Sequence, residues 1–166
     1  MQHPFTVEVA ENMVQVRFLE SFHHTKHYRG LINAVMDIVA TSLPNKQWAL
    51  LVDWGNLFIQ IPEEEKLCML FLQEYKTAGL RYLVNITPKH PVVDWQMNKI
   101  IAKHSDIDIM VSDDVTEGLR WLAKRNIDVQ ANAVEITPNW FKPSDAFSAL
   151  LKKYNLSASK FDARYE

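Results

Sequence analysis

The sequence contains little cysteine and little glycine, and both shortages exclude classes of protein. Its single cysteine, Cys68, rules out an internal disulfide framework and is typical of a reducing compartment. Only 4 of the 166 residues are glycine while 48% are hydrophobic, so the chain is neither fibrous nor disordered and can bury a sizeable core. We therefore expect one globular domain with a short extension.

The sequence also lacks a strong excess of one charge and any long apolar run. The formal net charge is −2, and the 18 Lys and Arg residues are scattered, which argues against a nucleic-acid partner. No segment approaches the ~18 consecutive apolar residues of a membrane span, and the N-terminus MQHPFTVEVAENM lacks the pattern of a secretion signal. These features predict a soluble cytoplasmic protein without a membrane span.

Hydrophobic periodicity predicts an alternation of strands and helices. Period-two alternation over residues 5–9 and 13–18 predicts an antiparallel hairpin, and the helical stripe of Leu31, Val35 and Ile38 predicts the first helix. Strands are then expected at 48–54, 80–87 and 107–111, and helices at 62–78, 91–104 and 114–126. This alternation, with a ββαβαβα core, predicts an α/β fold with a mixed, mainly parallel sheet, in which the first strand is antiparallel and lies at an edge.

The character of the chain changes after Asp128. We expect a domain over residues 1–128 and a C-terminal extension over 129–166, with a short strand within 132–140 and a short helix within 143–154. Phe147, Leu150 and Leu151 share one face of that helix. The extension is expected to cover its own domain or a neighbouring subunit.

The junction between the strand at 48–54 and the helix at 62–78 carries no residue typical of catalysis or of phosphate binding. Open α/β sheets hold ligands and nucleophiles at such strand ends, but residues 57–62 contain no Ser, Cys, His, Lys or glycine-rich cradle. Asp53 and Trp54 are the ligand candidates there, although Gly55 and Asn56 favour a turn-stabilising role for the Asp53 carboxylate. The sequence thus predicts no enzyme activity and no cofactor.

An apolar run, LCMLFL at residues 67–72, covers more than one helical turn and follows an apolar loop. Because one helix face cannot bury all of it, we expect an exposed interaction surface for a protein partner or a second copy. This predicted surface comprises Leu57, Phe58, Ile59, Ile61, Leu67, Met69 and Leu70. The open alternative is a thick core, or a face covered by the C-terminal extension.

Three histidines, His23, His24 and His27, cluster before the first helix. On a helix they would share one face, and Glu20 could complete a metal site. The segment also has the composition of a solvated connection, and three histidines without cysteine give weak support for a metal. We therefore prefer a hydrated loop and expect no metal.

Four other residues have a plain structural interpretation beside a chemical one. His104 lies on an apolar stripe, which favours a hydrogen-bonded core histidine, and Cys68 is expected to be a small buried hydrophobe. His90 and Asp94 are spaced for an acid/base pair, but Asp94 is equally a favourable first-turn charge.

Two segments, LLVDWGNLFIQIPEEEKLCMLFLQEYKTAGLRYLVNI and IDIMVSDDVTEGLRWL, resemble STAS domains, the anti-sigma-factor-antagonist fold, and especially their divergent SpoIIAA-like relatives. The resemblance covers about residues 5–126. Its motifs are Asp53 and Asn85 at strand ends, Gly79 before a strand, and the pair Trp121 and Leu122 in the last core helix. It implies the STAS fold and a regulatory or interaction role.

The chain departs from that family at the start of the second helix. In phospho-regulated members a serine there accepts phosphate, whereas residues 60–63 here are Gln-Ile-Pro-Glu, and no serine occurs between Ser42 and Ser105. Two functions remain. One is a non-enzymatic regulatory or interaction module that binds a protein partner or itself, most simply as a homodimer. The alternative is a carrier of a small apolar, lipid-like molecule.

Overall fold

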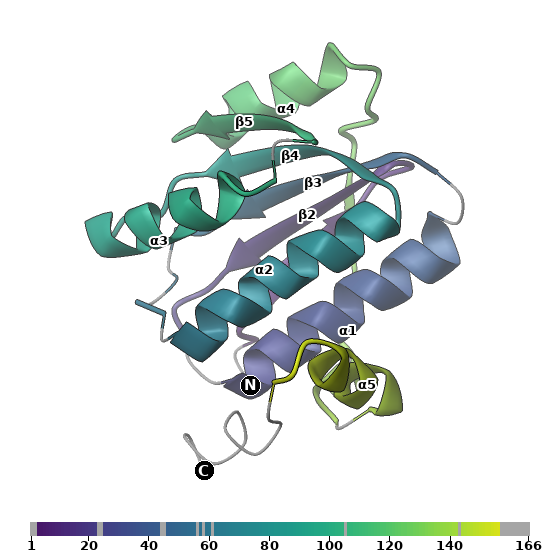
Figure 1. The fold of residues 1–166 in the computed structure, drawn as a ribbon. Helices are drawn as coiled ribbons and strands as arrows, with labels where there is room; N and C mark the ends of the chain where they lie inside the picture. Colours follow the sequence, from purple (N-terminus) through teal and green to yellow (C-terminus); the bar gives the residue numbers. More distant parts are fainter. Residues whose placement is uncertain are drawn as a thin grey trace.

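The chain forms an α/β fold, which confirms the predicted fold class (Figure 1). The computed structural model describes residues 3–22, 25–43, 46–55, 57, 59–60, 62–104, 106–142 and 144–156, apart from the side chains of Thr25 and Glu63. Within these residues the strands form one six-stranded sheet of order β5-β4-β3-β2-β1-β6.

The helices and strands follow the predicted order closely. The strands are β1 (Phe5–Val9), β2 (Met13–Phe18), β3 (Trp48–Asp53), β4 (Leu80–Ile86), β5 (Asp108–Ser112) and β6 (Asn132–Ala133). The helices are α1 (Thr25–Ser42), α2 (Pro62–Thr77), α3 (Pro91–Ile101), α4 (Val115–Ala123), a 3₁₀ turn η1 (Pro138–Phe141) and α5 (Asp145–Lys153).

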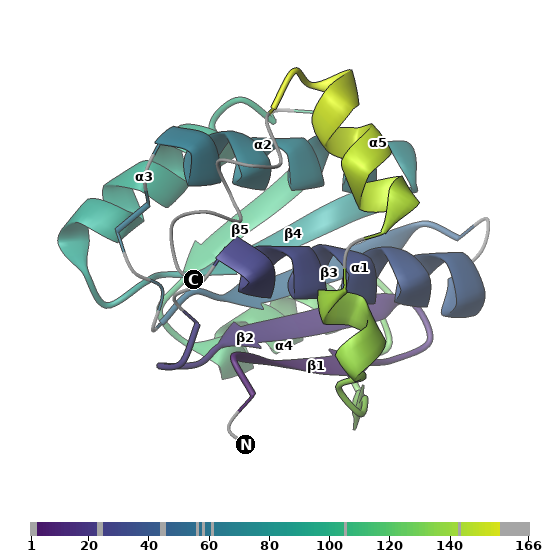
Figure 2. The same cartoon turned by 90° about the horizontal axis from the view of Figure 1, so that it is seen from below.

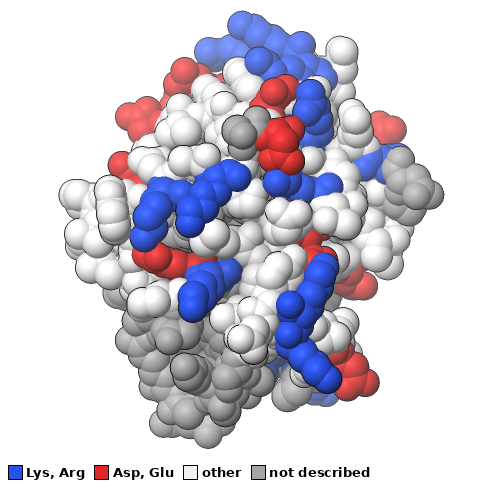
Figure 3. All heavy atoms as spheres, viewed as in Figure 1, with Lys and Arg blue, Asp and Glu red and all other residues white. Residues whose placement is uncertain are grey.

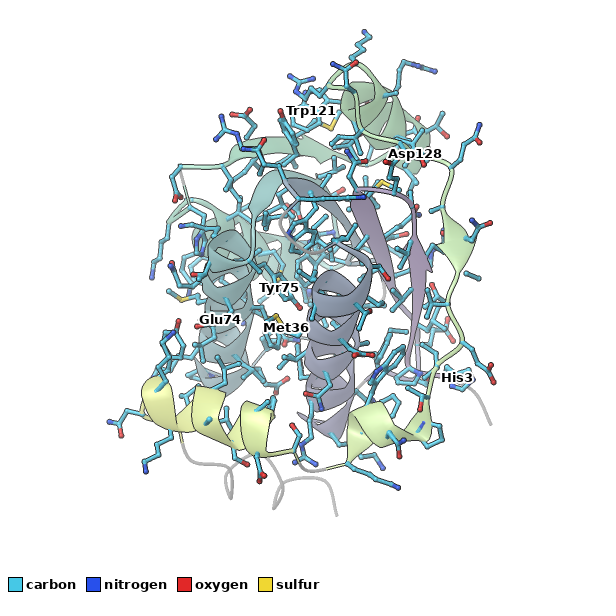
Figure 4. All side chains as sticks on the ribbon, turned by 90° about the vertical axis from the view of Figure 1, so that its right-hand side faces the viewer. His3, Met36, Glu74, Tyr75, Trp121 and Asp128 are labelled. Carbon is cyan, nitrogen blue, oxygen red and sulfur yellow. The ribbon has the colours of Figure 1, made fainter. Side chains whose placement is uncertain are left out.

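The sheet is mixed, with β2, β3, β4 and β5 parallel and β1 antiparallel to β2. The predicted edge position of β1 is wrong, because β6 pairs with β1 on its outer side, with Glu8 opposite Ala133. Side-chain contacts explain this path. After α4, the backbone N–H of Asp128 donates to Oδ1 of Asn12 at 3.0 Å, which holds the returning chain beside the β1–β2 turn (Figure 4).

Helices cover both faces of the sheet (Figures 1 and 2). Helices α1, α2 and α3 lie on one face and α4 lies on the other. The central strand β3 divides its residues between the two layers: Leu50 and Val52 join the core under α1 and α2, and Ala49 and Leu51 join the core under α4. A strand buried on both faces requires a nearly continuous apolar sequence, as 48–52 provides.

Helix α2 is buried on more sides than its apolar pattern predicts. It contacts β4 beneath it, α1 on one side and α3 on the other. Figure 4 shows Tyr75 of α2 and Met36 of α1 lying between these two helices. All of the 67–72 run except the half-buried Met69 is buried, so the thick-core alternative is correct for this helix and the expectation of a large exposed face is wrong.

The C-terminal extension packs on its own chain. Trp140, Phe147 and Leu151 are buried in the same core as β1–β4, and the backbone oxygen of Trp140 accepts a 2.7 Å hydrogen bond from Asn33 of α1. Gly30 permits this approach, because a Cβ atom there would lie 2.3 Å from the ring of Phe141. Residues 132–140 hold only the two-residue β6 and most of η1 in place of a longer strand.

Candidate functional site

The carboxyl ends of the parallel strands meet at one edge of the sheet, where open α/β proteins hold their ligands. Asp53 ends β3 at this edge. Its Oδ1 accepts a hydrogen bond from the backbone N–H of Gly55 at 3.0 Å, and its Oδ2 lies 3.3 Å from Nε of Arg17 on the neighbouring β2. Both carboxylate oxygens therefore have partners within the protein, and the contact with Gly55 is the turn-stabilising role that the sequence favours.

Trp54, the second ligand candidate, faces the core. Its ring stacks on Phe18 with centroids 5.0 Å apart, and its indole N–H donates to Oδ1 of Asn85. Asn85 is fully buried, and its Nδ2 has no hydrogen-bond partner among the described residues. Trp54 and Asn85 thus form a buried polar contact that anchors the start of the β3–α2 connection to the end of β4.

Gln96 fastens the β3–α2 connection to α3, and sequence reasoning missed it. The backbone N–H of Gln60 donates to Oε1 of Gln96 at 2.9 Å, while Nε2 of Gln96 donates to the Gln60 carbonyl at 2.7 Å and to Glu65 at 2.9 Å. The only hint in the sequence is that Gln96 stands directly beside Met97, which belongs to the apolar stripe of this helix. These bonds make the connection and α3 one structural unit.

The predicted interaction surface is mostly interior. Leu57, Leu67 and Leu70 are 4%, 0% and 4% exposed, so they pack in the core and cannot face a partner. Ile59 is 52% exposed and Met69 is half-buried. Phe58 and Ile61 lie outside the described residues. The physical reason for the error is that α3 and the sheet cover the faces of α2 that the sequence pattern assigned to solvent.

A different apolar surface lies at the carboxyl edge. The large hydrophobic side chains that are exposed in the described part of the chain are Ile59, Val92, Trp95 and Val111. Ile59 follows β3, Val92 and Trp95 lie at the start of α3 after β4, and Val111 is near the end of β5. We call these four residues the edge patch. Its signal in the sequence is a tryptophan placed off the apolar stripe of the third helix.

His27 does not belong to a hydrated loop, which corrects the preferred interpretation of the histidine cluster. It lies in α1, is 9% exposed, and packs against Phe22 at 5.6 Å between ring centroids and against Phe141 at 6.4 Å. His23 and His24 lie outside the described residues. Among the residues that are described, no group of three or more His, Cys, Asp and Glu side chains is arranged to hold a metal ion.

The remaining chemical candidates have structural roles. Nδ1 of His90 caps α3 by accepting from the backbone N–H of Val92 at 3.2 Å, and Asp94 accepts from Asn98 at 3.3 Å, so these two residues do not form the acid/base pair. Cys68 is buried, and burial, with the nearby charge of Glu64, raises the pKa of its thiol far above the usual value. A thiol held in this way is not an activated nucleophile.

An apolar cavity lies between α1, α2 and the sheet. Its volume is about 30 Å³, and its walls include Phe18, Leu50, Val52, Trp54 and Phe71. A space of this size is comparable to a single water molecule. It does not accommodate a lipid chain in this conformation.

The described side chains at the carboxyl edge therefore offer apolar contact and structural hydrogen bonds. The latter include the 2.8 Å bond that the Ser112 hydroxyl at the end of β5 donates to Glu117 of α4. None of the described helices combines the length and the apolar character that a membrane span requires. No family model, curated protein or solved structure matches this chain.

Proposed function

We propose that this chain is a non-enzymatic, STAS-like interaction module that binds a protein partner, most simply a second copy of itself, through the edge patch. The observation that carries the proposal is that the exposed large hydrophobic residues of the described chain are confined to the carboxyl edge of β3, β4 and β5. Single apolar residues scattered over a surface need no explanation. Their confinement to one edge is typical of a binding surface.

Trp95 is the natural anchor of this surface. It is 61% exposed, and the ammonium of Lys99 lies 4.5 Å from the centre of its ring. Lys99 also forms a 3.0 Å ion pair with Glu65, which restrains the cation beside the ring. Tryptophan is enriched among the residues that contribute most to protein interfaces. A tryptophan whose environment is ordered before binding loses less conformational entropy in the complex.

The STAS-like part of the proposal draws support from the order of elements from β1 to α4, ββαβαβαβα, and from the strand-end residues Asp53 and Asn85. Pro62 begins α2, and Glu64 and Glu65 lie in its first turn. These residues offer no hydroxyl group that could accept a phosphate, and the two glutamates would repel a phosphate group bound there. We infer that partner binding here does not depend on a phosphoserine at the start of α2.

The alternative function, transport of a lipid-like molecule inside the core, has less support. The cavity between α1, α2 and the sheet is lined by packed apolar side chains, and its volume of about 30 Å³ would have to increase greatly. Opening it would separate α2 from its contacts with α1 and β4.

Sedimentation velocity tests self-association. The wild-type chain is expected to form a dimer whose proportion rises with concentration. The double variant Ile59→Ser/Trp95→Ser should remain monomeric with nearly unchanged thermal stability, because both side chains are exposed. The matched control, Arg120→Ser/Lys124→Ser, changes exposed residues on and beside α4 and should dimerise like the wild type.

A wild-type chain that stays monomeric at every concentration would reject the homodimer. A photo-crosslinking residue then tests for another protein partner in cell extract, placed at position 95 or, as the control, at position 120. A defined adduct from position 95 alone supports the proposal. Equal labelling from both positions, or none from either, contradicts it.

A further inference from the structure

A second surface hollow lies between α2 and the end of α3. Its volume is about 380 Å³, within the range of about 300–1,000 Å³ for small-molecule sites. Met69, Leu70 and Gln73 line it from one face of α2, and His104 lines it from the chain just after α3. The C-terminal extension completes the wall with Tyr154 and Leu156. Three separate segments of the chain therefore shape this hollow, which none of the sequence predictions identified.

Two lysines on the wall lack a carboxylate partner. Lys66 and Lys103 line the hollow, and among the described residues neither forms an ion pair. Nζ of Lys103 lies 3.9 Å from Sδ of Met69, so this side chain reaches across from the α3 side to α2. Figure 3 shows basic side chains on either side of an uncharged strip on this face. Two positive charges at this hollow are therefore not neutralised by a described carboxylate.

Three nearby carboxylates are already paired with other lysines. Glu65 pairs with Lys99 at 3.0 Å, and Asp106 pairs with Lys76 at 2.8 Å. Glu74 accepts from Lys153 at 2.8 Å and from the hydroxyl of Tyr154 at 2.7 Å. Because these acids are engaged elsewhere, they do not compete for the two lysines at the hollow. The ion pairs also fix the walls, since Glu74 holds the C-terminal end of α5 against α2.

Apart from Gln73 and His104, the rest of the wall is mainly apolar. Leu70 is buried, and Met69 and Leu156 are half-buried. The Tyr154 hydroxyl is bound by Glu74, which leaves the ring as the part available to a ligand. A purely apolar ligand would leave both lysines unneutralised and would cover part of their hydration. A small inorganic anion would leave the apolar wall exposed to water. The wall thus matches a molecule that has an apolar part and one anionic group.

His104 contributes a buried imidazole with an unpartnered ring nitrogen to the wall of the hollow. It is 5% exposed, and its Nδ1 lies 3.3 Å from Nζ of Lys76. An ammonium group only donates, so Nδ1 accepts, and the neutral imidazole carries its proton on Nε2. That buried Nε2 has no hydrogen-bond partner among the described residues. Because this nitrogen is buried, an anion in the hollow would not contact it directly. The negative charge beside the ring would still favour the protonated imidazole, so His104 can report binding.

We propose that the hollow between α2 and α3 binds a small amphipathic anion whose apolar chain packs on Met69, Leu70 and Leu156 and whose carboxylate or phosphate group lies near Lys66 and Lys103. The site is separate from the edge patch and does not depend on the proposed partner interaction. The apolar chain would displace water from the half-buried side chains, and the lysines would select against neutral and cationic molecules.

Isothermal titration calorimetry on the full chain tests this proposal, with octanoate and octyl phosphate as probes for the two anionic groups. Either probe should bind saturably at one site, and 1-octanol and octyltrimethylammonium, which have the same chain length, should bind at least about tenfold more weakly. The Lys66→Gln/Lys103→Gln variant should lose about tenfold in affinity for the anion. Lys124→Gln/Lys152→Gln removes the same charge from exposed positions outside the hollow and should bind like the wild type.

A pH titration of His104 by NMR locates the binding. Its surroundings include Lys76, Lys103 and Asp106, and a bound anion favours the protonated imidazole, so the pKa of His104 should rise when octanoate is present. Equal affinity for octanol and octanoate, unchanged affinity in the Lys66/Lys103 variant, or binding that leaves the His104 titration unchanged would each overturn the proposal. Thermal melting of each variant shows whether it is folded.

Discussion

Nδ1 of His104 lies 3.3 Å from the ammonium nitrogen of Lys76, which itself forms a 2.8 Å ion pair with Asp106. Burial of the imidazole and the positive charge of Lys76 lower the pKa of His104 below its ordinary value of 6.5, while Asp106 acts in the opposite direction. The folded protein therefore favours the neutral ring, and the unfolded chain binds a proton there more readily.

Acidification below a pH of about 6.5 is expected to destabilise the protein through His104. A lowered histidine pKa contributes stability that is present above the unfolded pKa and is lost as the pH falls towards the folded pKa, because the unfolded state then binds more protons. Urea unfolding of wild type and His104→Gln should show a smaller loss of stability for the variant over this pH window. His3→Gln, a change at an exposed histidine, is the control. Parallel pH profiles for His104→Gln and wild type would contradict the prediction.

Substitution of Glu74 by glutamine should loosen the contact between α5 and α2. Hydrogen bonds from Lys153 and Tyr154 lower the pKa of Glu74, so its ionised form holds α5 against α2. Amide hydrogen exchange in α5 should become faster in Glu74→Gln at neutral pH, with less change in the sheet. In wild type the same loosening should appear as the pH falls through the lowered pKa of Glu74, since the contribution is present only above it.

The control for this experiment is Lys152→Gln, which removes an exposed charge one residue away from Lys153. It should leave exchange in α5 unchanged. Equal protection of α5 in wild type and Glu74→Gln would show that apolar packing of Phe147 and Leu151 holds the helix without this pair.

Trp54→Phe should lower the free energy of unfolding by about 1–3 kcal/mol, because it leaves the buried Oδ1 of Asn85 without its donor. Adding Asn85→Leu replaces the remaining polar partner by an apolar side chain of similar size. Chemical denaturation should then show the double variant to be more stable than Trp54→Phe alone. If the double variant loses as much free energy of unfolding as the two single variants together, the Trp54–Asn85 hydrogen bond does not contribute to stability.

Gly118→Ala should destabilise the protein although it removes a glycine from a helix. A Cβ atom at this position would lie 2.6 Å from Cγ1 of the fully buried Val84, a clash that costs about 1–3 kcal/mol in packed cores. The gain in helix propensity, about 1 kcal/mol, offsets only part of it. Thermal denaturation should show the loss, and the same substitution in a Val84→Ala background should cost less. An equal cost in both backgrounds would contradict the clash.

The order and bounds of most elements were predictable because each is specified locally. Pro62 begins α2 as expected, and Gly79, with its φ of +105°, lies between α2 and β4 as the sequence indicates. The alternation over residues 5–9 and 13–18 likewise identifies β1 and β2. The position of β6 was not predictable, since it depends on contacts between Asp128 and Asn12 that lie 116 residues apart in the sequence.

The candidate site was harder to predict for the same reason. A run of apolar residues in α2 indicates that the helix has a wide apolar face, but only the arrangement of α1, α3 and the sheet decides how much of it is covered. Leu67 and Leu70 were therefore assigned to the surface in error, while Trp95 was not identified as a surface residue. The hollow beside Lys66 and Lys103 joins α2, α3 and the C-terminal extension, and no local pattern reports that arrangement.

The packing of the C-terminal extension on α1 also determines when this chain can finish folding during synthesis. The outer side of α1 is covered by Trp140 and Phe141, which follow their contact residues Asn33 and Gly30 by more than a hundred positions. A ribosome exposes the amino-terminal half first, so β1, β2 and α1 leave the exit tunnel long before the residues that complete their core are made. Such distant contacts slow folding. On the nascent chain, the side of α1 that Trp140 and Phe141 cover therefore stays open until those two residues have been synthesised.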